Sequence, residues 1–355
     1  MAVTYSVSRM ASREAIPDLH RIWADSLRDA GDVEERLRWY AQAPTACDHV
    51  FVLAAHESTL PNRIVGTAGL EIRAFALAGR ELRVALGCNL AVEPAHRTLF
   101  PGLRLLREVQ RATTAELDLA YNFPNERAQP LFVRAGYHEL GRMPRYVRIL
   151  RHATYVSRVV PVTAVASGAG AAIDLVVGAR YALRHRRAAR ALELVWLDDV
   201  DARFDALWER ARHEYVLVGR RDASWLRWRY LVFPRSRARI AALVEHGPGA
   251  DVRAYALVTE RDGVAHVRDL FGSIGDLDPL LALLTRELRG RGATSASFGY
   301  LGSDGVVALL DAHGFRPRPT SRRVFVAAGA ALSVKERAIA TSPTAWHLTE
   351  FDEDS

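Results

Sequence analysis

Residues 86–109 read Leu86-Gly87-Cys88-Asn89-Leu90-Ala91-Val92-Glu93-Pro94-Ala95-His96-Arg97-Thr98-Leu99-Phe100-Pro101-Gly102-Leu103-Arg104-Leu105-Leu106-Arg107-Glu108-Val109. Apolar residues alternate with others before Pro94 and recur at every third or fourth position after Gly102. This change of period predicts a buried strand, a turn and an amphipathic helix. Because the first N–H groups of a helix are unpaired and its dipole is positive there, the start of this helix can seat an anion such as a phosphate.

The turn carries a motif, Val92-Glu93-Pro94-Ala95-His96-Arg97 followed by Gly102. It resembles the acyl-CoA pyrophosphate loop of the GNAT acyltransferase superfamily, Val-x-Pro-x-x-(Gln/Arg)-x-x-Gly-x-(Gly/Ala). Arg97 and Gly102 fall on fixed positions of that pattern. Phe100 stands where the middle glycine would be, and Pro101 has no N–H to offer a phosphate. The alternative is an ordinary strand, turn and helix without a ligand.

Length and composition set the class of protein. The chain has 355 residues, 49% hydrophobic and 8% aromatic, which is enough for two packed domains. Its net charge is +7, yet 47 of its 48 basic residues are arginines scattered among acidic residues, so no nucleic-acid partner is expected. Two cysteines, Cys47 and Cys88, are too few for a disulfide framework or a metal cluster. Since the first 18 residues lack a signal-peptide core, we expect a cytoplasmic protein. We also expect no bound metal.

The first half contains the elements of one complete α/β unit. Helices are predicted near residues 12–27 and 33–40, strands over 50–55, 64–73 and 81–92, and a strand over 117–122 after the motif helix. A helix from about residue 126 ends at Gly136, and Tyr146 to Leu150 closes the unit as its last strand. This order resembles the whole GNAT fold and places an N-terminal domain at residues 1–152.

The second half repeats this unit. Leu37-Arg38-Trp39-Tyr40 recurs as Leu226-Arg227-Trp228-Arg229-Tyr230, and the spacing from Asn122 to Gly136 equals that from Tyr300 to Gly314. Shared spacing over about 150 residues indicates a duplicated domain. We therefore predict an α/β (α+β) protein with two tandem GNAT-like domains, each a mixed central sheet flanked by helices. The second domain, residues 194–345, is degenerate: its loop at 269–278 holds carboxylates that would repel a pyrophosphate.

Two further segments complete the chain. Residues 153–193 are an apolar and then basic connector between the domains, and the stretch 159–190 superficially resembles a membrane span with a positive flank. An inter-domain helix packed on both sheets explains the same composition better. Residues 346–355 form an acidic tail, in which Trp346-His347-Leu348-Thr349 resembles the ending of bacterial two-copy GNAT proteins. The alternative is a solvated acidic tail.

The resemblance also implies where chemistry would occur. In the superfamily the backbone of the central strand pairs with the pantetheine arm, and an asparagine ending the next strand contacts it. The residues that this places at the cofactor are Leu90, Ala91, Val92, Arg97, Thr98, Leu99, Phe100, Gly102, Leu103, Asn122, Asn125 and Phe132. Phe132 stands at the position where members of the superfamily usually have a tyrosine that acts as the general acid. Tyr121, Tyr137 or water must therefore protonate the departing CoA thiolate. Glu71 and Glu93 are the candidate bases, although Glu71 also suits a solvated strand position.

The function implied is an acyl-CoA-dependent N-acyltransferase, with acetyl-CoA or another acyl-CoA in the N-terminal domain. The acceptor would be a primary amine of a small molecule or an amino sugar. Two alternatives stay open: a non-catalytic tandem GNAT binding module, and an aminoacyl or peptidyl transferase of the tandem GNAT type. The sequence does not indicate the oligomeric state.

Overall fold

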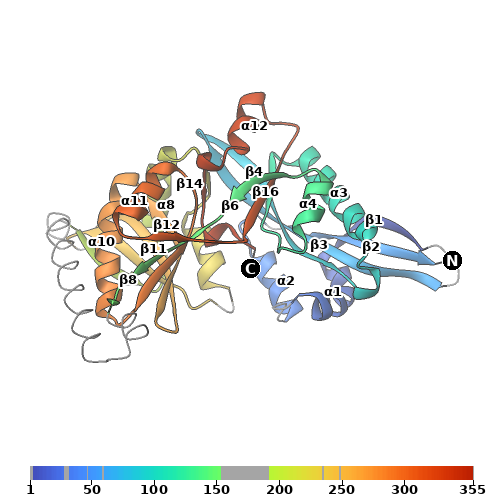
Figure 1. Cartoon of the computed structure of the whole chain (residues 1–355), viewed down its shortest axis with the longest axis horizontal. Coiled ribbons are helices and arrows are strands. Elements are labelled where there is room, and N and C mark those ends of the chain that lie inside the picture. Colours follow the sequence, from blue (N-terminus) through green and yellow to red (C-terminus); the bar gives the residue numbers. More distant parts are fainter. Residues whose placement is uncertain are drawn as a thin grey trace.

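The computed structural model describes residues 3–27, 32–45, 47–57, 60–152, 192–233, 236–247 and 249–354. Two lobes lie side by side, each with a mixed β-sheet and helices packed against it (Figure 1). The predicted fold class, a duplicated α/β unit, is therefore confirmed. Residues 153–191, which hold most of the predicted connector and of the segment considered for membrane contact, lie outside the described ranges. Within those ranges no helix is long and apolar enough to cross a membrane.

The first sheet is organised around β3 and β4, which pair along most of their length. Its strand order is β14-β17-β9-β3-β4-β5-β16-β6, with β2 also on β3 and β1 on β2. Its strands are β1 (Thr4–Ala11), β2 (His49–Glu57), β3 (Leu60–Leu77), β4 (Arg80–Val92), β5 (Leu119–Asn122), β6 (His138–Arg142), β9 (Leu217–Gly219), β14 (Leu301–Gly302), β16 (Arg323–Ala328) and β17 (Trp346–Leu348).

The helices α1 (Ser12–Ser26) and α2 (Val33–Ala41) lie on the opposite face of this sheet from α3 (Leu99–Glu116) and α4 (Gln129–Ala135). Alternation along β2 shows the division, because Val50 and Val52 pack with α1 whereas Phe51 and Leu53 pack with α3. Both faces are thus covered by apolar stripes, as the helical periodicity predicts.

The second sheet has the order β15-β7-β13-β12-β11-β10-β8. Its strands are β7 (Arg145–Ile149), β8 (Leu192–Leu197), β10 (Arg239–Glu245), β11 (Val252–Arg261), β12 (Val264–Gly272), β13 (Ser295–Gly299) and β15 (Arg316–Arg318). The helices of this half are α8 (Ala202–Ala211), α9 (Ala223–Leu226), α10 (Ile274–Gly290), α11 (Asp304–Ala312) and α12 (Val334–Ala340). Short 3₁₀ and π turns occur in both halves, among them η1 (Pro94–His96) between β4 and α3, and η5 (Glu350–Asp352) after β17.

Helix α3 begins earlier than the sequence pattern indicated. It starts at Leu99 and not after Gly102, so Pro101 lies in its first turn. A proline is tolerated there because the first N–H groups of a helix have no intrahelical partner. The predicted end of α4 is confirmed, since Gly136 follows it with a left-handed φ of 95°.

The two halves exchange strands. β7, which the sequence assigned to the first unit as its last strand, pairs with β13 and β15 of the second sheet. In return β16 lies between β5 and β6 of the first sheet. The predicted last strand of the first unit is therefore wrong in its sheet, although it is a strand. Consequently the division between the two sheets does not coincide with a domain boundary at residue 152.

The acidic tail is part of the core. β17 pairs in parallel with β9 of the first sheet, and Trp346, Thr349 and Asp352 are each at most 1% exposed. Arg221 joins Asp352 at 2.6 Å and Asp269 of β12 at 3.2 Å, so the tail and the two sheets share one buried ion network. A solvated tail, the alternative raised by its composition, is therefore wrong. The carboxylates are neutralised by an arginine distant in sequence.

Candidate active site

The central strands of the first sheet separate at one end. β4 pairs with β5 only from Val84 to Leu86. Just beyond, β4 contains a bulge where Asn89 has a φ of +52°, a conformation that asparagine tolerates better than most residues. The backbone of residues 87–92 is thus paired on the β3 side only, among the described residues. We call this opening the first splay; Leu90, Ala91 and Val92, predicted to face a cofactor, lie along it.

Asn122 ends β5 at the first splay. Its side-chain oxygen would lie 2.0 Å from a Cβ atom on Gly87, so only glycine fits opposite it. Its Nδ2 is buried and makes no hydrogen bond of normal geometry, although the amide interacts with the Tyr137 hydroxyl. Burial raises the pKa of Tyr137 well above its usual value, which keeps the phenol protonated. The ring of Phe132 lies 5.0 Å from that of Tyr137. The structure therefore brings together three of the predicted site residues.

The start of α3 is open to solvent at its tip. Thr98 precedes the helix without a side-chain cap, and Phe100 is 62% exposed. Gly102 completes this first turn and Leu103 follows it. The first N–H groups of the helix have no intrahelical partner, and Pro101 contributes none, so the expected anion seat is limited to the other residues of the turn. The Arg97 guanidinium is held at the end of β4, where it donates to the Val92 carbonyl at 2.7 Å and to Ser26 at 2.9 Å. Arg97 thus lies beside the seat but already has protein partners.

Glu71 lies on β3, and its side chain is on the face of the first sheet opposite α3. Its Oε2 accepts from Arg73 at 2.6 Å and 3.0 Å, while its Oε1 is buried without a hydrogen-bond partner. Tyr40 of α2 and Cys88 of β4 share this surrounding, and burial together with the Glu71 charge raises the pKa of the Cys88 thiol. Glu71 is therefore not the solvated strand residue that its position also suited, because it is 4% exposed.

The tail adds two carboxylates beside Glu71. Asp354 is exposed to solvent, yet desolvation by the surrounding protein and the Glu71 charge raise its pKa to about 6. Burial likewise raises the pKa of Glu353 to about 7, and this side chain pairs with Arg322. A side chain that is wetted but crowded by protein suits a proton acceptor. Sequence reasoning missed both residues because it treated 346–355 as a tail; the Thr349 and Asp352 capping pair was the available signal.

Three other candidates have structural partners elsewhere. Glu93 is held by Arg21 and by Arg63, the latter at 3.0 Å. The Tyr121 hydroxyl is fully buried and donates to the Asp352 carbonyl at 2.9 Å. The Asn125 side chain accepts from the Ala128 N–H at 3.1 Å before α4. The Leu99 side chain lies outside what the structure describes.

The second unit has an equivalent opening that the protein itself fills. β12 pairs with β13 only from Val264 to Val267. Beyond that point the Leu270 carbonyl accepts from His347 at 2.9 Å and the Gly272 carbonyl from the Tyr215 hydroxyl at 2.6 Å. Burial lowers the pKa of His347 to about 3, so a neutral ring donates.

The start of α10 is filled as well. The Ile274 N–H, at the first position of the helix, donates to the Glu214 carboxylate at 2.7 Å. Asp276 lies in the same first turn. A protein carboxylate therefore occupies the seat that an anion would need, in contrast to the uncapped start of α3.

Comparison with known proteins identifies the fold. No protein-family model and no curated protein sequence matches the chain. A probable N-acyltransferase from Enterococcus faecalis superposes with a TM-score of 0.62 at 11% identity, covering 92% of this chain and 73% of the other. A GCN5-related N-acetyltransferase from Anabaena variabilis gives 0.60 at 13%, covering 92% and 72%. One from Kribbella flavida gives 0.57 at 12%, covering 91% and 71%.

Proposed function

From a fold that is that of the GCN5-related N-acetyltransferases, we propose that the chain transfers an acyl group from an acyl-CoA to a primary amine, with the CoA in the first unit. The observation that carries this proposal is the first splay itself, where β4 leaves β5 after Leu86 and Asn122 Nδ2 makes no hydrogen bond of normal geometry. On the other face of the sheet, Glu71 Oε1 is buried without a hydrogen-bond partner. A buried polar atom without a partner is costly unless a ligand completes it. In the second unit, by contrast, side chains of His347 and Tyr215 already donate to the strand carbonyls at the opening.

The residues divide the chemistry as follows. The backbone of residues 87–92 and the Asn122 amide bind the pantetheine arm, which would place the thioester at the first splay. The amine nitrogen attacks the acyl carbon, the C–S bond breaks, and the nitrogen's proton passes to a carboxylate. Glu71 Oε1 accepts a hydrogen bond from the amine, and Asp354 takes the amine's proton. The Tyr137 hydroxyl keeps its proton and donates a hydrogen bond to the departing thiolate, which takes its own proton from water. Solvent exposure of Asp354 lets that proton leave again.

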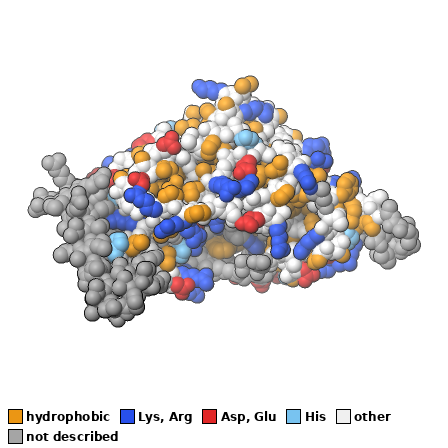
Figure 2. All heavy atoms as spheres, viewed as in Figure 1, with side chains coloured by type: hydrophobic (Ala, Val, Ile, Leu, Met, Phe, Trp, Pro, Cys, Tyr) orange, Lys and Arg blue, Asp and Glu red, His pale blue; other side chains and the backbone are white. Residues whose placement is uncertain are grey.

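The alternatives make different demands on the surface. An aminoacyl transferase that uses charged tRNA calls for a continuous arginine surface, whereas Figure 2 shows blue and red side chains interspersed on the face in view. A non-catalytic module is favoured by one observation, the exposed Phe100 beside an Arg97 that already has partners. Binding of acetyl-CoA without turnover for any amine would establish that second alternative. A small-molecule acceptor and a cytoplasmic location remain parts of our proposal.

The CoA seat can be tested with a matched pair of glycines. Gly102→Asp places a carboxylate in the first turn of α3, and its Cβ would meet only the Leu131 side chain, at 3.4 Å. Charge repulsion should weaken acetyl-CoA binding by about 2 kcal/mol or more, roughly thirtyfold, in calorimetry. Gly275→Asp makes the same change at the start of α10, where nothing lies within 4 Å, and should leave the affinity unchanged. Equal affinities for the two variants would exclude the first unit as the CoA site.

The pH dependence tests the proton acceptor. Because Asp354 must be ionised, kcat/KM should rise with pH through about 6, the value to which its surroundings raise its pKa. A carboxyl whose pKa is raised by folding binds its proton more tightly when folded, so the free energy of unfolding falls as pH rises from about 4 to about 6. Asp354→Asn should remove the effect on the rate profile and reduce the effect on stability, measured in urea titrations at pH 5 and pH 8. Glu353, whose pKa is raised to about 7, retains part of the stability effect. An unchanged rate profile would assign the proton to another group.

A further inference from the structure

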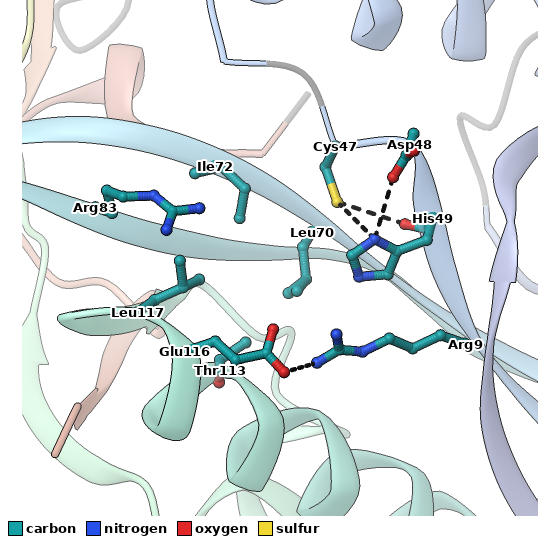
Figure 3. Close-up of a pocket in the computed structure, with 10 residues that line it drawn as sticks. All are labelled: Arg9, Cys47, Asp48, His49, Leu70, Ile72, Arg83, Thr113, Glu116 and Leu117. Carbon is teal, nitrogen blue, oxygen red and sulfur yellow. Dashed lines mark hydrogen bonds and ion pairs between the residues drawn. The ribbon is translucent and has the colours of Figure 1, made fainter.

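A pocket of about 440 Å³ lies under the far end of α3, on the α3 face of the first sheet. Its floor is apolar, formed by Leu70 and Ile72 of β3 with Leu117, and Arg83 of β4 reaches in from one side (Figure 3). α3 has 18 residues and is therefore about 27 Å long. The pocket is thus well separated from the anion seat at the start of that helix, and its lining contains none of the residues assigned to CoA or to acyl transfer.

The charged groups around the pocket differ in how closely they are paired. Arg9 and Glu116 form an ion pair on the rim. Asp48 is fully exposed and approaches His49 Nδ1 at 3.4 Å. The Arg83 guanidinium makes no hydrogen bond or ion pair with any side chain in the described ranges, and it points toward the apolar floor (Figure 3). The Arg83 charge also acts on Glu116, but at more than contact distance. A guanidinium whose hydrogen-bond donors have no side-chain partner, over an apolar floor, suits one anionic head group attached to an apolar body.

We propose that this pocket binds a small amphipathic anion, an apolar chain or ring whose single carboxylate or comparable group is held by Arg83. The volume falls in the range typical of small-ligand sites. The last carbonyl groups of a helix carry partial negative charge and would repel an anion if they were unpaired. At the end of α3 this repulsion is reduced. The carbonyls of Thr113 and Thr114 already accept from the Leu117 and Ala330 N–H groups. The site is independent of the acyltransferase proposal, since no step of that chemistry uses it.

Cys47 provides a local reporter. Its thiol lines the pocket opposite Arg83, where it donates to the His49 carbonyl at 3.6 Å (Figure 3). Burial raises the pKa of this thiol, so it is slow to react but partly accessible. The other cysteine, Cys88, is buried on the opposite face of β4 and serves as an internal reference in the same chain.

The test measures alkylation of the full-length protein by iodoacetamide, located by peptide mass, with octanoate as the probe. Octanoate should slow the labelling of Cys47 in a saturable way and leave Cys88 unaffected. Octanol should protect less, and octylamine least, because only the carboxylate pairs with Arg83. Arg83→Gln should raise the octanoate concentration for half-protection by about tenfold, as expected when one charge-assisted contact is lost.

Arg111→Gln is the matched control, since Arg111 is an exposed arginine of α3 that pairs with Glu108 away from the pocket. It should not change the octanoate concentration for half-protection. The proposal is overturned if octanoate leaves Cys47 labelling unchanged, if octylamine protects as well as octanoate, or if Arg83→Gln behaves like Arg111→Gln. Acetyl-CoA binding, measured separately, decides the proposed function whatever the outcome with octanoate.

Discussion

Replacing Arg221 with methionine should lower the free energy of unfolding by about 3–5 kcal/mol, because it leaves two buried carboxylates without their cation. Arg221 is 0% exposed and contacts Asp269 at 3.2 Å and Asp352 at 2.6 Å. Tyr255 and Thr349 also donate to Asp269, at 2.6 Å and 2.7 Å, so the network is closely packed. Urea titration followed by tryptophan fluorescence measures the loss.

The neighbouring arginine is the control for this prediction. Arg220 is 36% exposed at its side chain and pairs with Asp222, so Arg220→Gln should cost at most about 1 kcal/mol. The loss in Arg221→Met should also be larger at pH 8 than at pH 5, because carboxyls that have lost their cation bind protons more tightly when folded. Adding Asp269→Asn and Asp352→Asn should recover part of the stability. Similar losses for the two arginine variants would mean that the network does not stabilise the fold.

Tyr137→Phe should lower turnover by about 10²–10⁴-fold, the usual effect of losing a positioned proton or hydrogen-bond donor. The hydroxyl lies beside the Asn122 amide at the first splay, and burial raises the pKa of the phenol and keeps it protonated. The phenyl ring retains its place against Phe132, so the acetyl-CoA affinity should change little. Release of free thiol at saturating acetyl-CoA, with a panel of primary amines, measures the effect.

Tyr121→Phe is the matched control. Its hydroxyl donates to the Asp352 carbonyl in the core, so its removal should reduce stability by about 1–3 kcal/mol while turnover persists. If Tyr121→Phe abolishes turnover in the folded protein while Tyr137→Phe leaves it unchanged, then Tyr121 is the proton donor and Tyr137 has only a structural role.

Much of the candidate site could be predicted because it depends on local order in the chain. Asn122 marks the end of β5, and Gly136 marks the turn after α4. The short segment between them places Tyr137 near the end of β5 through local structure. Glu71 could be predicted as a residue on a central strand, but not as a buried one. Its burial depends on Arg73 and on a tail that arrives nearly 280 residues later in the chain.

The sequence by itself determined the duplication and the main elements of the first unit, because apolar periodicity and turn residues such as Pro94 act within a few positions. Tertiary structure alone decided which sheet each strand joins. β7 alternates arginines with apolar residues whereas β16 is mostly apolar, but backbone hydrogen bonds are the same for every strand, so composition does not specify the partners they exchange. It also decided that the first splay is open and the second filled, because His347 and Tyr215 reach β12 only after the whole chain has folded.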